Sequence, residues 1–436
     1  MMNYQEALAW LDELNTFGIQ LGLRRIERLT ELLGHPERCY RTVHVTGTNG
    51  KGSASAMLAA ALSCSGFRTA LYTSPHLASY TERMRIDGHE ISEAAFAQTL
   101  TKVRQAVERL TAGGEESPTQ FEVLTAQAFL WFAEERVEYA VVEVGLGGLL
   151  DSTNIITPVL SAITNVTLEH ADRCGGTLEG VARHKAGIIK AGVPVVTAAQ
   201  GMPLDVIRQT ATEKGASLYV RGEDFTSVKR GISAARQQLV FSGKRHSLRD
   251  WPYELSLLGE YQIENSAVAV QAFLLLQAME PRLTLDALRA ALAKTIWPGR
   301  FEAMDIGRRR IRVDGAHNPG GAAALRTSLD VYFPAADRVF LLGILRDKDI
   351  DAMLAALLRP EDRAVFTTPA SERAANPAVL EEKAAAREKR VEPDPAKALD
   401  LALKMAGGES LLVVAGSLYL VGGIRKLLQA RRDGAL

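Results

Sequence analysis

The sequence predicts an α/β protein built from two doubly wound domains, a larger N-terminal one and a smaller C-terminal one. Short apolar runs alternate with amphipathic helical stretches through most of the chain, which is the rhythm of a parallel sheet with crossover helices. The rhythm is interrupted at Trp297-Pro298-Gly299-Arg300 and restarts afterwards. At roughly 100 to 200 residues per domain, the 436 residues suit two large domains. We therefore predict domains at 1–296 and 297–436.

The N-terminal domain is predicted to begin with an amphipathic helix and to continue with alternating strands and helices. The helix covers Met1–Leu14. Buried strands, which can form one sheet, are expected at Arg41–Thr46, Arg68–Tyr72, Glu138–Val144, Val159–Val166 and Val193–Thr197. Helices are expected between them at Ser53–Ser65, Ser92–Leu110, Gln120–Glu135 and Thr177–Lys190. A polar stretch from Gly222 to Trp251 predicts a small antiparallel segment, followed by helices at Glu260–Ala278 and Thr284–Lys294.

The C-terminal domain repeats the alternation on a smaller scale. Its strands are expected at Arg310–Val313, Arg338–Leu342, Ala364–Thr367 and Leu411–Ala415, with helices between them. This pattern predicts a second doubly wound sheet of the Rossmann-like kind.

The composition excludes several classes of protein. The 51 Lys and Arg residues balance 51 Asp and Glu residues, so the net charge does not indicate a nucleic-acid binder. Three cysteines without a C-x-x-C pair fit a reducing compartment. The first helix carries Glu6, Asp12 and Glu13 rather than a secretory signal, and no apolar run reaches the ~20 residues that span a bilayer. We therefore expect a cytoplasmic monomer that binds neither nucleic acid nor membrane.

The strongest local signal is a glycine-rich turn between a β-branched strand and a helix, Val43-His44-Val45-Thr46-Gly47-Thr48-Asn49-Gly50-Lys51-Gly52-Ser53. Glycines let backbone N–H groups converge on phosphate oxygens, the following helix directs its positive end there, and a lysine can reach the terminal phosphates. We predict that this turn binds ATP through Gly47, Thr48, Asn49, Gly50, Lys51, Gly52 and Ser53, which makes the domain a P-loop ATPase-type domain. ATP is favoured over GTP because no N-K-x-D element is present.

The spacing of this turn departs from the standard G-x-x-x-x-G-K-[ST] pattern, because position 45 is Val and Gly52 separates Lys51 from Ser53. The departure disfavours a generic kinase or GTPase. A glycine turn with an incidental lysine is the alternative interpretation, and the shared register of strand, turn, lysine and helix favours nucleotide binding over it.

Two side chains at the ends of other predicted strands are candidates for binding magnesium. Ser74 follows the strand that ends at Tyr72, and Glu143 stands among apolar neighbours near the end of the next strand. A buried carboxylate is costly unless it is paired or bound to a metal, and pairing with a basic residue is the alternative. Hard oxygen ligands together with phosphate oxygens suit magnesium better than zinc.

Two further candidates are weaker when the residues are taken alone. His170 lies just beyond the strand over Val159–Val166, where a hydrogen-bonded loop histidine is the alternative. Lys185 lies on the predicted helix that ends near Gly192, where a solvated cation favoured by the helix dipole is the alternative. A glycine-rich loop over Gly145–Asn154 permits close backbone approach to a ligand, but it lacks the G-x-G-x-x-G and helix of a dinucleotide site.

Three residues of the second half lie where ligand contacts are common. Asn265 is predicted within a helix, Arg300 follows Pro298-Gly299, and Asp314 ends a strand. Taken alone, Asn265 can be a neutral helix residue, Arg300 a surface cation and Asp314 a turn former. Asn318 before Pro319 suits a helix cap. We expect a site closed by two domains, with the guanidinium reaching a nucleotide phosphate.

Taken together, these residues resemble the folylpolyglutamate synthase and dihydrofolate synthase family, within the Mur-ligase-like ATP-dependent amide ligases. The resemblance covers nearly the whole chain, through Gly47–Ser53, Leu71–Leu77, Phe121–Thr125, Glu143–Asn154, His184–Lys190, Trp297–Glu302 and Asp314–Pro319. It implies that Mg²⁺ is bound by Ser74, Glu143 and His170, with Lys185 carbamylated into an oxygen ligand. It also implies ATP contacts from Asn265, Arg300 and Asp314. The pterin-bearing substrate would lie near Thr119, Gln120, Phe121, Glu122, Leu150, Asp151 and Ser152.

The activity implied by this resemblance is the ATP-dependent joining of L-glutamate to dihydropteroate, to reduced folates, or to both. ATP would phosphorylate the substrate carboxyl, and the amine of glutamate would attack the acyl phosphate. Lys51, Arg300 and magnesium would offset charge on the transferring phosphoryl group. We count Lys51, Lys185 and His317 as the catalytic group, with His317 acting either as a base or as a residue that orders the domain interface.

Two other functions also fit the phosphate loop. A Mur-type peptidoglycan ligase is disfavoured, because the loop begins at Gly47 and leaves no room for a preceding UDP-sugar domain. A non-enzymatic nucleotide switch would bind ATP without consuming it alongside glutamate.

Overall fold

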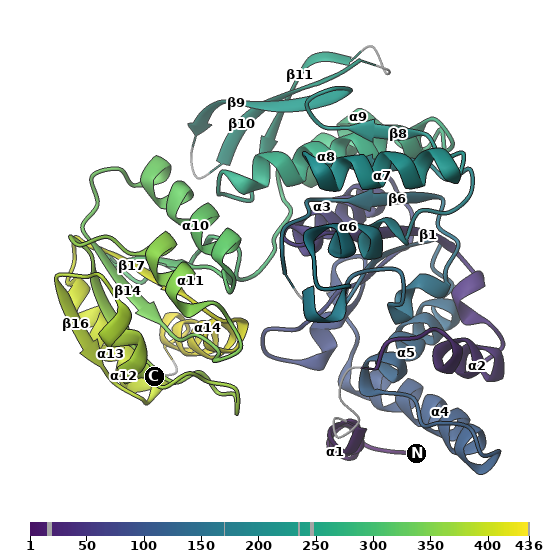
Figure 1. Ribbon diagram of the computed structural model, residues 1–436, viewed down its shortest axis with the longest axis horizontal. Helices are drawn as coiled ribbons and strands as arrows, with labels where there is room; N and C mark the ends of the chain where they lie inside the picture. The colour runs from purple at the N-terminus through teal and green to yellow at the C-terminus, as the bar shows by residue number, and fades with distance from the viewer. Residues whose placement is uncertain (15–19, 170, 234–235, 245–247, 435–436) are drawn as a thin grey trace. The chain divides into compact units, whose positions relative to one another are not determined.

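The computed structural model describes residues 1–14, 20–169, 171–233, 236–244 and 248–434, which fall into two compact units (Figure 1). The first unit consists of Met1–Gly231, Gln238–Leu255 and Glu264–Thr295. The second consists of Ile232–Gln237, Ser256–Ile263 and Ile296–Leu436. Both contain a largely parallel sheet with helices between its strands, so the predicted α/β class is confirmed.

A sheet of eight strands among the described residues forms the centre of the first unit, in the order β4-β3-β2-β5-β1-β6-β7-β8. The strands are β1 (Arg41–Thr46), β2 (Thr69–Tyr72), β3 (Met84–Ile86), β4 (His89–Glu90), β5 (Tyr139–Glu143), β6 (Leu160–Ile163), β7 (Val195–Thr197) and β8 (Leu218–Val220). Only β3 and β4 are antiparallel to their neighbours. The five predicted strands all lie in this sheet. The short β3, β4 and β8 lack a long apolar run and were not predicted.

Strand β1 has a central place in this sheet. It pairs in parallel with β5, where Val45 lies opposite Glu143, and with β6, where Thr46 lies opposite Ile163. Because β2 also runs parallel to β5, the carboxyl ends of all four strands lie at one edge of the sheet. The loops that leave this edge carry the candidate site residues.

The helices described before residue 296 are α1 (Tyr4–Leu14), α2 (Arg24–Leu32), α3 (Lys51–Cys64), α4 (Glu93–Ala112), α5 (Gln120–Glu134), α6 (Leu178–Ala186), α7 (Met202–Glu213), α8 (Tyr261–Gln277) and α9 (Leu285–Leu292). The helices predicted before residue 296 are all present among the described residues, whereas α2 and α7 were not predicted. The prediction for α6 was too long, because it extended the helix to Lys190. Gly187 caps α6, and the N–H groups of Ile188 and Ile189 bond three residues back, which tightens and ends the helix.

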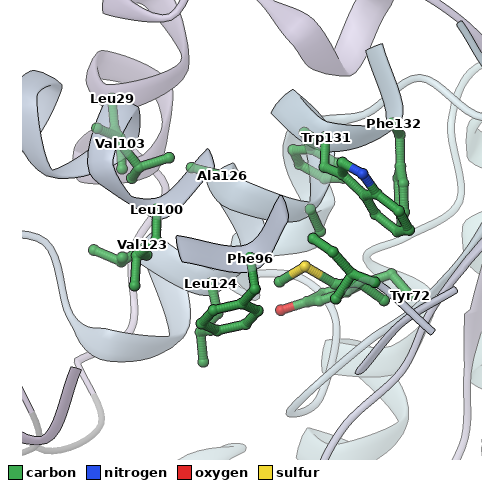
Figure 2. Close-up of a cluster of buried hydrophobic side chains, with 14 of the residues drawn as sticks. Leu29, Tyr72, Phe96, Leu100, Val103, Val123, Leu124, Ala126, Trp131 and Phe132 are labelled. Carbon is green, nitrogen blue, oxygen red and sulfur yellow. The ribbon is translucent and has the colours of Figure 1, made fainter. Parts of the chain in front are cut away.

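The apolar core beside this sheet contains side chains from α1, α2, α4 and α5 and from β2, β3 and β5, and Figure 2 shows part of it. Along α4, Phe96, Leu100 and Val103 recur at helical spacing and are fully buried. Figure 2 shows Phe96 near Leu124 of α5, Leu100 near Val123 of α5, and Val103 near Leu29 of α2. Each fully buried side chain of this size contributes about 1.5–3 kcal/mol by leaving water. This packing holds α5, and with it the loop before Gln120, in a fixed place.

A small separate sheet occupies the polar stretch between Gly222 and Trp251, as predicted. In the part of the chain that is described, its strand order is β11-β10-β9, with β9 (Phe225–Ser233), β10 (Arg236–Gly243) and β11 (Leu248–Leu255). Helix α9 packs against β11 (Figure 1).

The second unit contains a sheet of six described strands in the order β12-β13-β17-β14-β15-β16. They are β12 (Glu302–Ala303), β13 (Arg310–Val313), β14 (Arg338–Leu342), β15 (Arg363–Phe366), β16 (Glu388–Val391) and β17 (Leu411–Ala415). All run parallel except β12. The helices are α10 (Pro319–Tyr332), α11 (Ile350–Leu357), α12 (Pro377–Lys383), α13 (Pro395–Ala406) and α14 (Leu418–Arg432). The four predicted strands are present, and the edge strands β12 and β16 were missed.

No helix within the described ranges combines the length and the apolar character needed to cross a membrane.

Candidate functional site

The glycine-rich turn after β1 has a backbone that admits no side chain at two of its glycines. Gly47 and Gly50 have φ values of 151° and 87°. A Cβ on Gly47 would lie 1.8 Å from Oγ1 of Thr164, and one on Gly50 would lie 2.1 Å from Oδ1 of Asn265. Gly50 is followed directly by α3, which begins at Lys51 and directs its unbonded N–H end and its positive dipole toward the turn. The turn therefore has the features of an anion site.

The segment after β6 braces this turn. Oγ1 of Thr164 donates to the carbonyl of Asn49 at 2.6 Å, and the Thr48 N–H donates to the carbonyl of Asn165 at 2.8 Å. The side-chain oxygen of Asn165 accepts from the Asn49 N–H at 2.9 Å. The N–H groups of Thr48 and Asn49 are thus already engaged, so the anion-binding character of the turn comes from the N-terminal end of α3. Thr164 and Asn165 were not predicted as site residues, although polar residues at a strand's carboxyl end were an available signal.

Lys51 lies folded over the turn. Its Nζ donates to the carbonyl of Gly47 at 3.0 Å and to that of Thr48 at 3.1 Å. An ammonium group has three donors, so one hydrogen remains beyond these two bonds. Ser53, also predicted to contact the nucleotide, is buried in the first turn of α3.

The structure brings together two of the predicted magnesium ligands. Glu143 ends β5 and is 5% exposed, and its Oε2 accepts from the backbone N–H of Ser74 at 3.4 Å. His170, the third predicted ligand, lies outside the described residues. The described ranges contain no group of three or more His, Cys, Asp or Glu side chains placed to hold a metal ion. A divalent cation at Glu143 would therefore need oxygen donors of other kinds.

Lys185 of α6 is not a solvated cation at a helix end. Its side chain is only 5% exposed, and burial, reinforced by the positive charge of Lys51, lowers the pKa of its ammonium group to about 7. Asp151, Glu169 and Cys174 act in the opposite direction. A lysine with so low a pKa carries a large neutral fraction at neutral pH, which gives it a nucleophilic amine.

The glycine-rich loop after β5 packs against the C-terminal end of α6. The Leu149 N–H donates to the carbonyl of His184 at 2.7 Å, and a Cβ on Gly148 would lie 2.7 Å from that same oxygen. Oγ1 of Thr46 donates to the carbonyl of Gly147 at 2.7 Å, which ties this loop to the end of β1. The phosphate turn, the Glu143 strand end and this loop therefore lie at the same sheet edge.

Most of the predicted substrate residues hold this framework together. Thr119 and Glu122 form a reciprocal capping box at the start of α5, and Glu122 pairs with Arg25 at 3.0 Å. Asp151 accepts from the Leu146 N–H at 2.8 Å, and burial raises the pKa of its carboxyl group. Ser152, in the short 3-10 helix Ser152–Ile155, is also buried.

The remaining predicted substrate residues keep some exposed surface. Gln120 donates to the carbonyl of Leu11 at 2.9 Å and to the hydroxyl of Tyr80 at 3.1 Å, yet it is only partly buried. Phe121 is also partly buried and packs so closely on Gly145 that a Cβ there would lie 2.4 Å from its ring. Leu150 is exposed. These three side chains are the ones of the predicted set that are open to contact with a ligand.

The second unit gathers its candidates around Asp314, at the end of β13. The buried carboxylate accepts from the Tyr261 hydroxyl at 2.6 Å and from the N–H groups of Phe301 and Ala316, each at 2.8 Å. Burial raises the pKa of Asp314, and the positive charge of Arg300 opposes that rise.

Two neighbours of Asp314 have defined geometries. Nδ1 of His317 lies 2.8 Å from the carbonyl of Gly315, and because a carbonyl only accepts, Nδ1 carries a proton. Asn318 caps α10 by accepting from the Gly321 N–H at 2.7 Å, with Pro319 in the first turn. The expected cap is thus present.

Two family models match separate parts of the chain. Residues 45–273 match the Mur ligase middle domain, and residues 299–418 match the glutamate ligase domain of Mur ligases. The chain is 37% identical to folylpolyglutamate synthase of Lacticaseibacillus casei, over 98% of this chain and 99% of that protein. It is 32% identical to the dihydrofolate synthase/folylpolyglutamate synthase of Bacillus subtilis, over 98% and 99%.

Solved structures give the same result. Folylpolyglutamate synthase of Thermotoga maritima aligns with a TM-score of 0.85 at 34% identity, covering 98% of this chain and 97% of that one. The Mycobacterium tuberculosis synthase complexed with ADP and AMPPCP aligns with a TM-score of 0.88 at 32% identity, covering 98% and 99%. FolC of Escherichia coli in complex with DHPP and ADP aligns with a TM-score of 0.87 at 30% identity, covering 99% and 100%. The chain therefore belongs to the folylpolyglutamate synthase and dihydrofolate synthase family of the Mur ligases, as its phosphate turn and glycine-rich loop had indicated.

Proposed function

We propose that this chain is an ATP-dependent ligase that joins L-glutamate to dihydropteroate, to the glutamate tail of reduced folates, or to both, through an acyl phosphate. The relatives carry the names of these two activities, and FolC has been solved with DHPP and ADP. One observation carries the proposal. The phosphate turn, Glu143 with Ser74, and the Gly145–Asp151 loop lie at one edge of neighbouring parallel strands, which supports a shared place for ATP and the acceptor at that edge.

The reaction needs two displacements. A carboxylate oxygen of the acceptor attacks the γ-phosphorus of ATP, and ADP leaves. The amine of glutamate then attacks the acyl carbon, phosphate leaves with the electron pair of the C–O bond, and the amine loses a proton. Lys51 and the N-terminal end of α3 stabilise charge on the phosphates, which is most of what a protein contributes to phosphoryl transfer.

We propose a magnesium site at Glu143, with the Ser74 hydroxyl, His170 and carbamylated Lys185 as further ligands. The donor chemistry fits, since carboxylate and hydroxyl oxygens are what magnesium prefers, and phosphates complete its shell. When bound, the ion would offset the charge of the phosphates. The pKa of Lys185, lowered to about 7 by burial, supports carbamylation because the neutral amine is the form that adds CO₂. The product is an anionic oxygen ligand where an ammonium group stood.

The other assignments form part of the same proposal. Asn265 is proposed to contact ATP because it lies directly against Gly50 of the phosphate turn. Arg300 and Asp314 are proposed as further ATP contacts, and His317 as a residue that orders the region around them. We also keep the domain assignment at 1–296 and 297–436, and the expected cytoplasmic location.

The test is glutamate-dependent release of ADP, measured side by side with dihydropteroate and with tetrahydrofolate, with the product identified by mass. Turnover with either acceptor is expected, and it should disappear in Lys51→Ala. Lys214→Ala, which changes an exposed lysine at the end of α7, serves as the matched control. Failure with every pterin acceptor refutes the proposal, and ATP binding without any glutamate-dependent ADP release would favour a nucleotide switch instead.

A further inference from the structure

His44 is a fully buried imidazole in the middle of the central strand β1. Strand side chains alternate between faces, so Thr42, His44 and Thr46 share one face of the sheet. Nε2 of His44 lies 2.8 Å from Oγ1 of Thr153. Oγ1 of Thr153 lies in turn 2.6 Å from Oδ1 of Asp151. A buried chain of three side chains thus connects β1 with the glycine-rich loop.

The direction of the hydrogen bonds in this chain can be assigned. A threonine hydroxyl has one proton, and the Asp151 carboxylate accepts it together with the N–H groups of Thr153 and Leu146. Oγ1 of Thr153 must therefore accept from His44, whose proton lies on Nε2. Burial, reinforced by the charge of Lys190, lowers the pKa of His44 to about 3, so the ring is neutral.

Nδ1 of His44 is left as an unprotonated nitrogen with no hydrogen-bond partner among the residues that the structure describes. A buried acceptor without a partner is destabilising. An apolar residue in the centre of the sheet would avoid this cost. The cost therefore indicates that the Nε2–H bond has a role other than stabilising the fold.

That bond and the bond from Thr46 hold the glycine-rich loop at two separate points. Thr46 donates to the carbonyl of Gly147, and Asp151, oriented through Thr153, holds the Leu146 N–H at 2.8 Å. The phosphate turn has separate braces, in Thr164 and Asn165. Loss of the His44 link should therefore loosen the glycine-rich loop without loosening the phosphate turn.

We propose that His44 is a positioning residue that, as a neutral Nε2–H donor, fixes the Gly145–Asp151 loop for the acceptor substrate. The acceptor part of this inference rests on the proposed function. The expected signature is a change in the KM for the acceptor, with kcat and the affinity for ADP nearly unchanged.

The kinetic test compares His44→Leu, which removes the donor, with His44→Gln, whose amide can donate from nearly the same place as Nε2. H44L should raise the acceptor KM about tenfold, the effect of losing one buried hydrogen bond. H44Q should recover most of that loss. Thr42→Val is the matched control, because it removes a buried hydroxyl without a described partner from the same face of β1, and it should change nothing.

Thr153→Val removes the same link from the loop side, so it is measured in parallel in case H44L does not fold. T153V should reproduce the rise in KM, and the H44L/T153V double variant should be no worse than the poorer single one. A KM that stays at the wild-type value in T153V, or an equal loss of ADP affinity, would overturn the inference.

A second measurement does not depend on activity. In protein carrying ¹⁵N-labelled histidine, the His44 signal, assigned by its absence in H44Q, should show a protonated Nε2 and a bare Nδ1 that do not titrate between pH 5 and 8. The Nδ1–H tautomer, or titration near the ordinary histidine value, would contradict the inference. If the tautomer is as expected but no pterin is turned over, the proposed function fails and the loop anchoring stands.

Discussion

Replacing Gly50 with alanine tests the phosphate turn most directly, because two separate physical costs meet at this glycine. Its φ of 87° lies in the left-handed region, and a Cβ would lie 2.1 Å from Oδ1, 2.8 Å from Cγ and 3.0 Å from Nδ2 of Asn265. Asn265 is itself buried in α8, so its whole amide group would have to move. The change should weaken both the fold and nucleotide binding.

The chain offers a matched control that separates the two costs. Gly66 has nearly the same φ, 86°, but a Cβ there meets nothing within 4 Å. Gly66→Ala should therefore show only the backbone penalty, about 1–2 kcal/mol of unfolding free energy. Gly50→Ala adds the overpacking of the Asn265 amide, which typically costs a further 1–3 kcal/mol or so. The total for Gly50→Ala is then about 2–5 kcal/mol.

The assay is denaturant unfolding of both variants, followed with and without ADP, together with the affinity for ADP by calorimetry. Gly66→Ala should bind ADP as the wild type does, whereas Gly50→Ala should lose about tenfold or more, since displacing the turn by a few tenths of an ångström misaligns the phosphate donors. The double variant Gly50→Ala/Asn265→Ala should be more stable than the sum of its single changes, because the clash is gone.

Equal destabilisation by Gly50→Ala and Gly66→Ala would refute the steric part of this reasoning. Unchanged ADP affinity in Gly50→Ala would show that the turn does not hold the nucleotide. Strict additivity of Gly50→Ala and Asn265→Ala would exclude the contact between the two residues as the cause.

Three further predictions follow from the buried polar groups. Glu143→Gln should reduce turnover about a hundredfold or more and raise the magnesium concentration needed for half activity, because a neutral amide is a poorer ligand for a hard cation. An unchanged magnesium titration would exclude Glu143 as a ligand. Asp314→Asn should destabilise the protein by about 1–3 kcal/mol in a denaturant titration. The carboxylate accepts hydrogen bonds from Tyr261, Phe301 and Ala316, and the NH₂ group of the asparagine would face these donors. No loss of stability would mean that the amide had found other partners. In apo protein kept free of CO₂, the folded state binds fewer protons at Lys185 than the unfolded state between about pH 7 and 10.5, so the contribution of Lys185 to the free energy of unfolding rises with pH in that range. Lys185→Met should remove this rise. An identical pH profile of stability in the variant would contradict the lowered pKa.

The parts of the fold that could be predicted are those with a strong local signal. Arg310–Val313, Arg338–Leu342 and Leu411–Ala415 were predicted with the bounds they have. The last two are mainly apolar runs between clear breaks, and in the first, Ile311 and Val313 alternate with arginines. The edge strand β16, Glu-Lys-Arg-Val, carries no apolar pattern, because its stability comes from pairing with β15. The end of α6 was misplaced because Gly187 caps it earlier than the sequence pattern indicated.

The burial of Lys185 was not predictable from its own helix. A basic residue in the last turn usually faces solvent, where the helix dipole favours it. The side chain is buried because the loop containing Gly148, more than thirty residues earlier in the sequence, lies directly against the α6 backbone at His184 and Lys185. A contact of this kind depends on the order of the strands in the sheet, which local patterns do not specify.

The phosphate turn was predicted because glycine spacing, a lysine and a helix start are adjacent in sequence, whereas its braces Thr164 and Asn165 come from the neighbouring strand. The capping box of Thr119 and Glu122 was readable from the T-x-x-E spacing but was not used. Those two residues were assigned to the substrate by resemblance, although their side chains bond to each other and that of Glu122 also pairs with Arg25.

The buried polar groups of the first unit show how the sheet edge is arranged for positioning. His44, Asp151 and Lys185 all have pKa values shifted by burial in the direction that disfavours their charged forms. Apolar residues in these places would avoid the desolvation, so selection for stability alone does not explain a histidine, a carboxylate and an ammonium group beside two glycine-rich loops. Each group instead fixes or faces a loop that we propose to hold its shape around a phosphate or an acceptor. Because β1 carries the phosphate turn at its end and anchors the second loop through Thr46 and His44, one rigid strand sets the distance between the two loops. Changes at His44 or Thr46 should therefore alter catalysis more than they alter stability, whereas changes in the apolar core around Phe96 should do the reverse.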